Sequence, residues 1–307
     1  MKAAKIRLAG VAVALFSGAL FATDYYVDAN NGNDDWDGTS ATRGAGDVGP
    51  KKTLVGAMAI TGLGSGDVVY AAEGYYTNGV AEVGTARYRV SVPARVHLVA
   101  SGRASETFIV GEAAPAEAAD RDAYGNGTGS MRCVQLNSGA RLIGFTVTGG
   151  RTPAGSSGGG GIAGNTDAYI IDCIITNNVA AFRGGAIYYG PPTIRCFFEN
   201  NRAVTGVGHS RQGGYAYNCV CGTSPGPHFY IVTSYNCTFI GKSSRSGCTY
   251  NSIVLGGDTL IPDFCKGDEA AKKEVAQSVA WDLAVRPRSP ATTPSGRAAC
   301  AFSDARR

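Results

Sequence analysis

Charged residues are scarce in this 307-residue chain, at 17% of the sequence against about 25% in an ordinary soluble protein. The formal net charge is only +4, and the basic residues are dispersed rather than gathered in one run. This pattern excludes the basic footprint of a nucleic-acid-binding protein. Beyond the N-terminal segment the chain also lacks any apolar run long enough to span a membrane, so no span is expected in the mature protein.

The N-terminal segment itself has the pattern of a secretory signal peptide. Lys2, Lys5 and Arg7 form a positive start, residues 8–21 carry no charge, and Asp24 follows at once. The apolar stretch is short for a membrane span, and small residues near its end permit cleavage. We therefore expect residues 1–22 to be removed on export, with a retained N-terminal anchor as the alternative.

Internal repeats indicate the fold of the middle of the chain. The segments Ile171-Asp-Cys-Ile-Ile-Thr-Asn-Asn178 and Ile194-Arg-Cys-Phe-Phe-Glu-Asn-Asn201 match at Ile, Cys and the Asn pair with an offset of 23 residues. Each copy is a short strand closed by turn residues, and one strand per ~20–25 residues buries its apolar face only by stacking on its neighbours. A β-propeller needs about four strands per ~40–50 residues. The period therefore predicts an all-β chain with a parallel β-helix over residues 66–260.

Strand alternation assigns side chains to the inside or the outside of this solenoid. We expect Ile171, Cys173 and Ile175 to point inward, whereas Asp172 and Arg195 share an outward column and can pair. The nine cysteines are read as a ladder, with four of them forming an interior column of free thiols at Cys173, Cys196, Cys219 and Cys237. Two cysteines outside the repeats are the better disulfide candidates, namely Cys265 and Cys300.

The flanking segments differ from the repeats. Apolar residues at helical spacing near residues 51–62 predict a helix that caps the solenoid, within an N-terminal region of 23–65. Residues 112–128 break the pattern and are predicted to form an excursion loop. Residues 261–307 are predicted to form a C-terminal cap and tail, with a short helix at 268–279.

Four segments carry a family resemblance. The opening Tyr25-Tyr-Val-Asp-Ala-Asn-Asn-Gly-Asn-Asp34, with Gly66-Asp-Val-Val-Tyr-Ala-Ala-Glu-Gly-Tyr-Tyr76, resembles bacterial pectate-lyase-like right-handed β-helix proteins. Gly184-Gly-Ala-Ile187 is similar to repeats of chlamydial-type polymorphic outer-membrane proteins, and Trp281 begins a segment similar to the end of many such helices. The resemblance implies a right-handed β-helix that is secreted or lies at a bacterial cell surface or outer membrane. It implies no single activity, because enzymes and adhesins share these features.

The catalytic residues of the enzymes with this fold are missing from the repeats. Between residues 140 and 255 the acids are Asp167, Asp172 and Glu199. Hydrolases need two or three converging carboxylates, and lyases need a base together with a cation that neutralises a uronate. Our first hypothesis is therefore a non-catalytic, adhesin-like protein that binds glycans or surfaces. The alternatives are a lyase or hydrolase of acidic polysaccharide, and a structural envelope module.

Basic residues next to tyrosines form the candidate binding site. Arg202, His209 and Arg211 fall within one expected loop, and Tyr189 and Tyr215 lie on the flanking rungs. Guanidinium groups beside aromatic rings are suited to an acidic glycan, whereas solvated surface charge is the alternative reading. On the first reading, replacing Arg202 and Arg211 with Ala weakens glycan binding and leaves the melting temperature unchanged.

An acidic segment near the start is the candidate metal site. Its carboxylates can supply oxygen ligands to Ca²⁺, and they come from Asp28, Asp34, Asp35 and Asp37. The spacing is not that of an EF-hand, and turn formation by Asp and Asn is the alternative explanation. No other cofactor is expected.

Overall fold

The computed structural model describes residues 22–155, 158–204, 208–240, 244–245, 248–250 and 252–255. These residues belong to one compact unit, Met1–Cys265. The predicted signal segment up to residue 21, the predicted C-terminal cap at 261–307, Cys265 and Cys300 lie outside the described residues.

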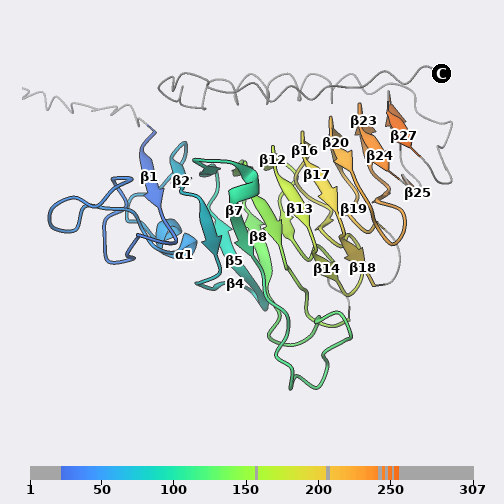
Figure 1. Cartoon of the computed structure of the whole chain (residues 1–307), viewed down its shortest axis with the longest axis horizontal. Helices are drawn as coiled ribbons and strands as arrows, with labels where there is room; N and C mark the ends of the chain where they lie inside the picture. The colour runs from blue at the N-terminus through green and yellow to red at the C-terminus, as the bar shows by residue number, and fades with distance from the viewer. Residues whose placement is uncertain are drawn as a thin grey trace, which may run out of the picture. The chain divides into compact units, whose positions relative to one another are not determined.

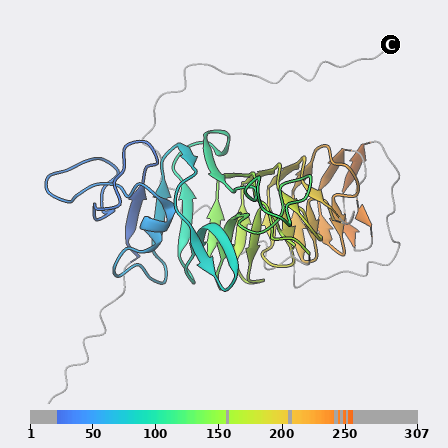
Figure 2. The same ribbon diagram turned by 90° about the horizontal axis from the view of Figure 1, so that it is seen from below.

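Three long sheets make up this unit, and their strands lie side by side in order (Figure 1, Figure 2). Sheet I contains β1 (Asp24–Val27), β2 (Val68–Ala71), β6 (His97–Ala100), β9 (Arg141–Ile143), β12 (Tyr169–Ile171), β16 (Thr193–Ile194), β20 (Tyr215–Tyr217), β23 (Thr233–Tyr235) and β26 (Thr249–Tyr250). Sheet II contains β3 (Gly74–Tyr76), β7 (Thr107–Val110), β10 (Thr146–Thr148), β13 (Ile174–Thr176), β17 (Phe197–Glu199), β21 (Val220–Cys221), β24 (Thr238–Ile240) and β27 (Ile253–Leu255).

Sheet III contains β4 (Ala81–Val83), β5 (Ala86–Val92), β8 (Arg132–Leu136), β11 (Ile162–Gly164), β15 (Ile187–Tyr188), β19 (Arg211–Gln212), β22 (Phe229–Tyr230) and β25 (Ser244–Arg245). A further parallel pair joins β14 (Val179–Ala180) to β18 (Arg202–Ala203). Among the described strands, β4 and β5 pair antiparallel and the other pairs are parallel.

The chain visits the three sheets in turn and returns to sheet I one strand further along. The strands β9, β10 and β11, for example, belong to sheets I, II and III, and β12 then pairs with β9. The 23-residue offset of the repeats is the register between neighbouring rungs, because Ile171 pairs with Ile194 and Ile175 with Phe198. The arrangement is mostly β, with long parallel sheets, and is compatible with a parallel β-helix.

A single left-handed residue forms the corner between sheets I and II. Asp172 has φ 54° and Arg195 has φ 52°. The alternation of inward and outward side chains does not continue unbroken through this corner. The core cluster contains Ile170, Cys173 and Ile175, so the inward position before the corner is residue 170 rather than 171. Since neighbouring strand residues point to opposite faces, Ile171 points outward. Our assignment of Ile171 to the inner face is therefore wrong, although its side chain is buried.

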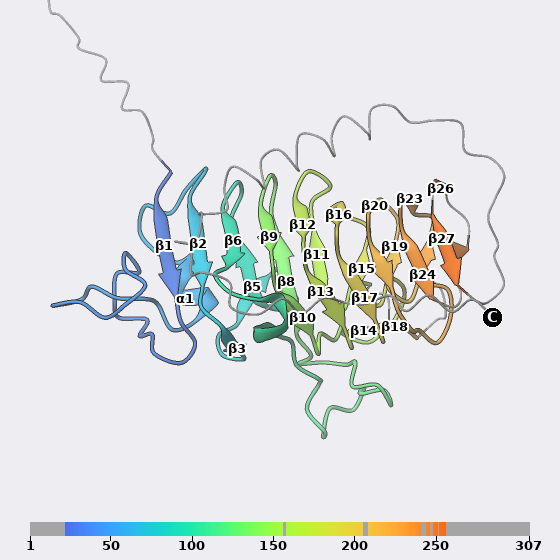
Figure 3. The same cartoon turned by 45° about the horizontal axis from the view of Figure 1, so that its top comes forward.

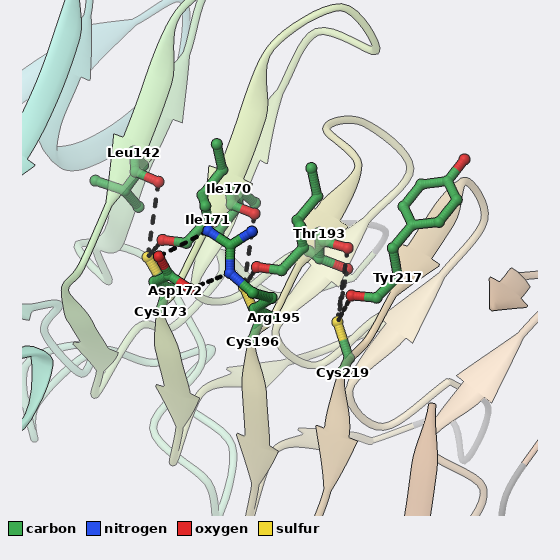
Figure 4. Close-up of polar contacts among 11 residues, drawn as sticks. Leu142, Ile170, Ile171, Asp172, Cys173, Thr193, Arg195, Cys196, Tyr217 and Cys219 are labelled. Atoms are coloured by element: carbon green, nitrogen blue, oxygen red, sulfur yellow. Dashed lines mark hydrogen bonds and ion pairs between the residues drawn. The ribbon is translucent and has the colours of Figure 1, made fainter. Parts of the chain in front are cut away.

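The predicted cysteine column is confirmed. Cys173, Cys196, Cys219 and Cys237 are free thiols, each at most 2% exposed. Each Sγ lies within hydrogen-bond distance of the carbonyl two residues before it, for example 3.3 Å from Cys219 to Tyr217 (Figure 4). The same Sγ also lies 3.6 Å from the carbonyl of Thr193 on the preceding rung. Outside the column, Cys248 is disulfide-bonded.

The predicted pairing of Asp172 with Arg195 is also confirmed. Nε and Nη2 of Arg195 donate to the two carboxylate oxygens of Asp172 at 2.7 and 2.9 Å (Figure 4). The pair is partly exposed, so it contributes about 1 kcal/mol or less to stability.

Paired asparagines form the corner after sheet II. Asn177 and Asn200 adopt left-handed φ values of 56° and 51°, as their turn role requires. Asn178 and Asn201, which follow them, are fully buried. The side-chain amide of Asn178 donates to Asn201 Oδ1 at 3.1 Å, so the two amides form a ladder between rungs.

The N-terminal helix is shorter than the segment predicted for it. It runs as α1 (Leu54–Met58), and the Thr53 hydroxyl caps its start by accepting from the amide of Gly56 at 2.9 Å. Leu54 and Ala57 enter the core cluster, and α1 contacts β1 and β5.

The predicted excursion at 112–128 is present as a loop between β7 and β8, and it extends away from the sheets (Figure 3). Within it, the Asp120 carboxylate accepts the amide of Thr128 at 2.8 Å. The short 3-10 helix η1 (Ala104–Glu106) directly precedes β7 in the chain and contacts β10.

The cysteine column generates a stability prediction. Cys196→Arg places an unpaired charge among buried thiols and is expected to destabilise the protein by about 3–5 kcal/mol, whereas Cys196→Ala leaves only a small void. Urea unfolding measures the difference. Asn218→Arg is the control, because Asn218 is an exposed corner residue in the column that contains Arg195. Equal stability of the two arginine variants would contradict the inward orientation of Cys196.

Candidate functional site

The structure does not bring the four predicted binding residues together on one surface. Arg202 lies in β18, Arg211 in β19 of sheet III and Tyr215 in β20 of sheet I. His209 is 5% exposed and Arg211 is fully buried. The expectation of an exposed basic loop is therefore wrong for His209 and Arg211.

Arg211 occupies the inward column of sheet III, because it pairs with the core residues Ile187 and Phe229 on the adjacent rungs. Its guanidinium donates to the carbonyls of Gly213, Pro191 and Gly190 at 2.6, 2.7 and 3.1 Å. Burial lowers its pKa to about 10. Replacing Arg211 with Ala is thus expected to lower the melting temperature, contrary to our expectation from the sequence.

Arg202 and Tyr215 have other packing partners. The guanidinium carbon of Arg202 lies 4.2 Å from the ring centroid of Tyr124, which belongs to the excursion loop. The ring of Tyr215 stacks on Tyr217 at 6.2 Å. Arg202 therefore holds the excursion loop against the rungs, and Tyr215 begins a row of stacked rings on sheet I that continues through Tyr235.

A serine and a histidine form a buried pair between β19 and β22. Ser210 Oγ lies 2.8 Å from His228 Nδ1, and His228 Nε2 lies 3.0 Å from the carbonyl of Gly222. A carbonyl only accepts, so Nε2 carries the proton and Nδ1 accepts from the hydroxyl. A nucleophile and its base have this arrangement. Both side chains are fully buried, so the pair has no access to substrate and is structural.

Three of the four acidic candidates for Ca²⁺ accept hydrogen bonds from the chain itself. Asp28 accepts the amides of Asn30 and Asn31 at 2.8 and 3.0 Å. Asp34 accepts the amide and hydroxyl of Thr53 at 2.8 and 2.7 Å. Asp37 accepts the amide of Thr39 at 2.9 Å, and the amide of Asp35 donates to Asn33 Oδ1 at 3.0 Å. Within the described ranges, no group of three or more His, Cys, Asp or Glu residues is placed to hold a metal.

An open groove lies instead at the corner between sheets III and I. Its volume is about 480 Å³, and it crosses the turns that follow β8, β11 and β15. The lining residues are Ser138, Gly164, Asn165, Thr166, Asp167, Tyr188, Tyr189 and Gly190. The groove therefore joins three successive rungs, about 4.8 Å apart.

Tyr189 presents the exposed aromatic surface of this groove. It is 48% exposed and has φ 38°, in the left-handed region. Its ring meets Tyr188 edge-on at 5.0 Å and lies over Gly213 of the next rung, where an added Cβ would be 2.5 Å from the ring. Gly213 is thus required for the position of the Tyr189 ring.

The polar side of the groove has one carboxylate. Asp167 accepts a hydrogen bond from the Ser138 hydroxyl, and Asn165 and Thr166 are exposed beside it. No lining residue is basic. An exposed ring beside hydroxyl, amide and carboxylate groups can bind and orient a polar ligand, but a single carboxylate does not form the acid pair of a hydrolase.

Sequence reasoning identified Tyr189 only as a neighbour of the basic cluster and Asp167 only as an isolated acid. The residues from 138 to 190 meet because of the rung register, which no local motif encodes. The glycines at 213 and 214 and the prolines at 191 and 192 were the available signal, since they mark tight corners.

The buried histidines generate a pH prediction. Burial lowers the pKa of His97 to about 4, with a contribution from the charge of Arg141. Burial also lowers the pKa of His228 to about 4, although the hydrogen bond to the Gly222 carbonyl raises that pKa in part.

The unfolded chain therefore takes up protons first, and stability that is complete above pH 6.5 falls as the pH approaches 4. We expect a loss on the order of 3 kcal/mol per histidine, measured by urea unfolding at pH 7.5 and 4.5. The double variant His97→Gln, His228→Gln should lose less between these pH values, and an equal loss would contradict the assignment.

No helix in the described part of the chain is long and apolar enough to cross a membrane. Comparisons with protein-family models, curated proteins and solved structures found no match to this chain.

Proposed function

We propose that the protein is an exported right-handed parallel β-helix, capped at its N-terminal end by α1, that binds a glycan chain without cleaving it. The observation that supports binding is the groove with the exposed ring of Tyr189. The sequence resemblance to pectate-lyase-like proteins favours the hand of the helix and a bacterial, extracellular location. Two core residues of α1, Leu54 and Ala57, favour its role as a cap.

A sugar fits the groove for two reasons. The flat face of Tyr189 offers apolar contact area at low conformational cost, and the hydroxyl, amide and carboxylate of Ser138, Asn165 and Asp167 offer hydrogen bonds beside it. Because the groove crosses three rungs, an extended chain can contact several corners at once, which raises the total affinity of weak contacts.

The charge of the groove favours a neutral glycan. Asp167 is the one ionisable acid among the lining residues, and none of them is basic. A uronate polymer would place its carboxylates near Asp167, and no basic residue among those that line the groove offsets the repulsion. The basic residues that favoured an acidic polysaccharide in the sequence are buried or stacked elsewhere, as Arg211 and Arg202 are.

A binding assay with a panel of oligosaccharides tests this proposal. We expect neutral glucan, xylan, mannan or chitin fragments to bind, and polygalacturonate and alginate not to bind. Tyr189→Ala should weaken binding by roughly tenfold, as the loss of a central aromatic anchor does, with little change in melting temperature. Tyr75→Ala is the control, because Tyr75 is 62% exposed on β3.

The alternatives make different predictions in the same assay. Unsaturated products from a uronate polymer, detected by absorbance, would establish a lyase, and reducing ends released from a neutral polymer would establish a hydrolase. Failure of every glycan to bind would favour the structural envelope module. Equal effects of Tyr189→Ala and Tyr75→Ala would move the binding surface away from the groove.

A further inference from the structure

We infer that Arg211 is a positioning residue. From inside the solenoid it holds the turn that carries Tyr189 at the groove, which we call the tyrosine corner. The expected effect of Arg211 on glycan affinity rests on the proposed function. Its expected effect on the structure of the groove rests on the hydrogen bonds of Arg211. The side chain does not reach the ligand, since it is fully buried.

Arg211 is anomalous in its column. The residues of sheet III in register with it are Val90, Val134, Ile162, Ile187, Phe229 and Ser244, and all of them except Ser244 belong to the apolar core cluster. A buried cation costs several kcal/mol in desolvation, and an apolar residue at the same place would avoid this cost. A role that depends on hydrogen-bond donors explains the arginine.

The acceptors of these donors lie in two adjacent corners. Gly190 and Pro191 directly follow Tyr189, and Gly213 lies beneath its ring. One guanidinium therefore joins the turn that carries the ring to the turn that supports it, with contacts of 2.6 Å to Gly213 and 2.7 Å to Pro191. The planar guanidinium presents its donors in a fixed geometry, so it sets the separation of the two corners.

The backbone of these corners requires such a restraint. A tyrosine with φ 38° is strained and persists only when its surroundings hold it. The amide of Tyr189 donates to the carbonyl of Gln212 at 2.7 Å, and this bond also joins the two corners. Gly214 has no room for a side chain, because an added Cβ would lie 2.2 Å from the Arg211 guanidinium.

Replacement of Arg211 by methionine tests the inference. Met fills the apolar column but donates no hydrogen bond, so the carbonyls of Gly190, Pro191 and Gly213 lose their donor. We expect the affinity for a neutral oligosaccharide to fall by roughly tenfold at a temperature where the variant is folded. We also expect faster amide hydrogen exchange at Tyr189 and Gly213.

A matched control separates this effect from general destabilisation. Arg89 is also buried, and it donates to the carbonyls of Val110 and Gly79 at 2.8 and 2.6 Å, in an earlier rung away from the groove. Arg89→Met should leave affinity and exchange at the tyrosine corner within twofold of wild type. Arg211→Lys keeps the charge and one flexible donor group, so it should restore part of the affinity and part of the slow amide exchange at the tyrosine corner. It serves as the test if Arg211→Met does not fold.

The outcomes distinguish this inference from the proposed function. If wild type binds no glycan, the function fails, yet faster exchange at the two corners in Arg211→Met alone still supports the positioning role. If wild type binds and Arg211→Met has normal affinity and exchange, the inference is overturned and the function stands. Equal losses in the Arg89 and Arg211 variants would also overturn it.

Discussion

One left-handed residue at each corner between sheets I and II, from β9 to β24, controls which side chains enter the core. At Asp172 and Arg195 the backbone takes φ values near 50°, and the chain turns there within a single residue. The residue that follows the corner is an inward cysteine, and the strand before it ends with an outward residue such as Ile171. The cysteine column, the aligned apolar residues and the outward ion pair all depend on this geometry repeating in register.

The register also explains why the interior tolerates polar groups at the other corners. The side-chain amides of Asn178 and Asn201 donate to the backbone carbonyls of Val147 and Ile175 on the preceding rung, and Arg211 donates to that of Pro191 in the same way. A buried polar group is stable when it is hydrogen-bonded. In a stacked fold the neighbouring rung supplies those partners without any change in the strands.

The groove is a consequence of the same stacking. Successive corners between sheets III and I bring Ser138, Asp167 and Tyr189 together although they are separated by up to 51 residues in the chain. Tyr189 stays exposed because Gly213 and the buried guanidinium of Arg211 leave its ring a place on the surface. The proposed binding of a glycan therefore depends on residues of the core as well as on those of the surface.

The sequence by itself determined the repeat, the strands, the cysteine column and the pairing of Asp172 with Arg195, because each follows from a local pattern repeated at a constant offset. It also identified the excursion loop, since that segment lacks the pattern. Tertiary structure alone decided that Arg211 and His209 are buried and that Tyr189 and Asp167 line one groove. The physical reason is that charge and residue type predict solvent exposure only on average. The rung register and the turn at each corner decide which side a given residue faces, and a polar side chain enters the core wherever neighbouring carbonyls satisfy it.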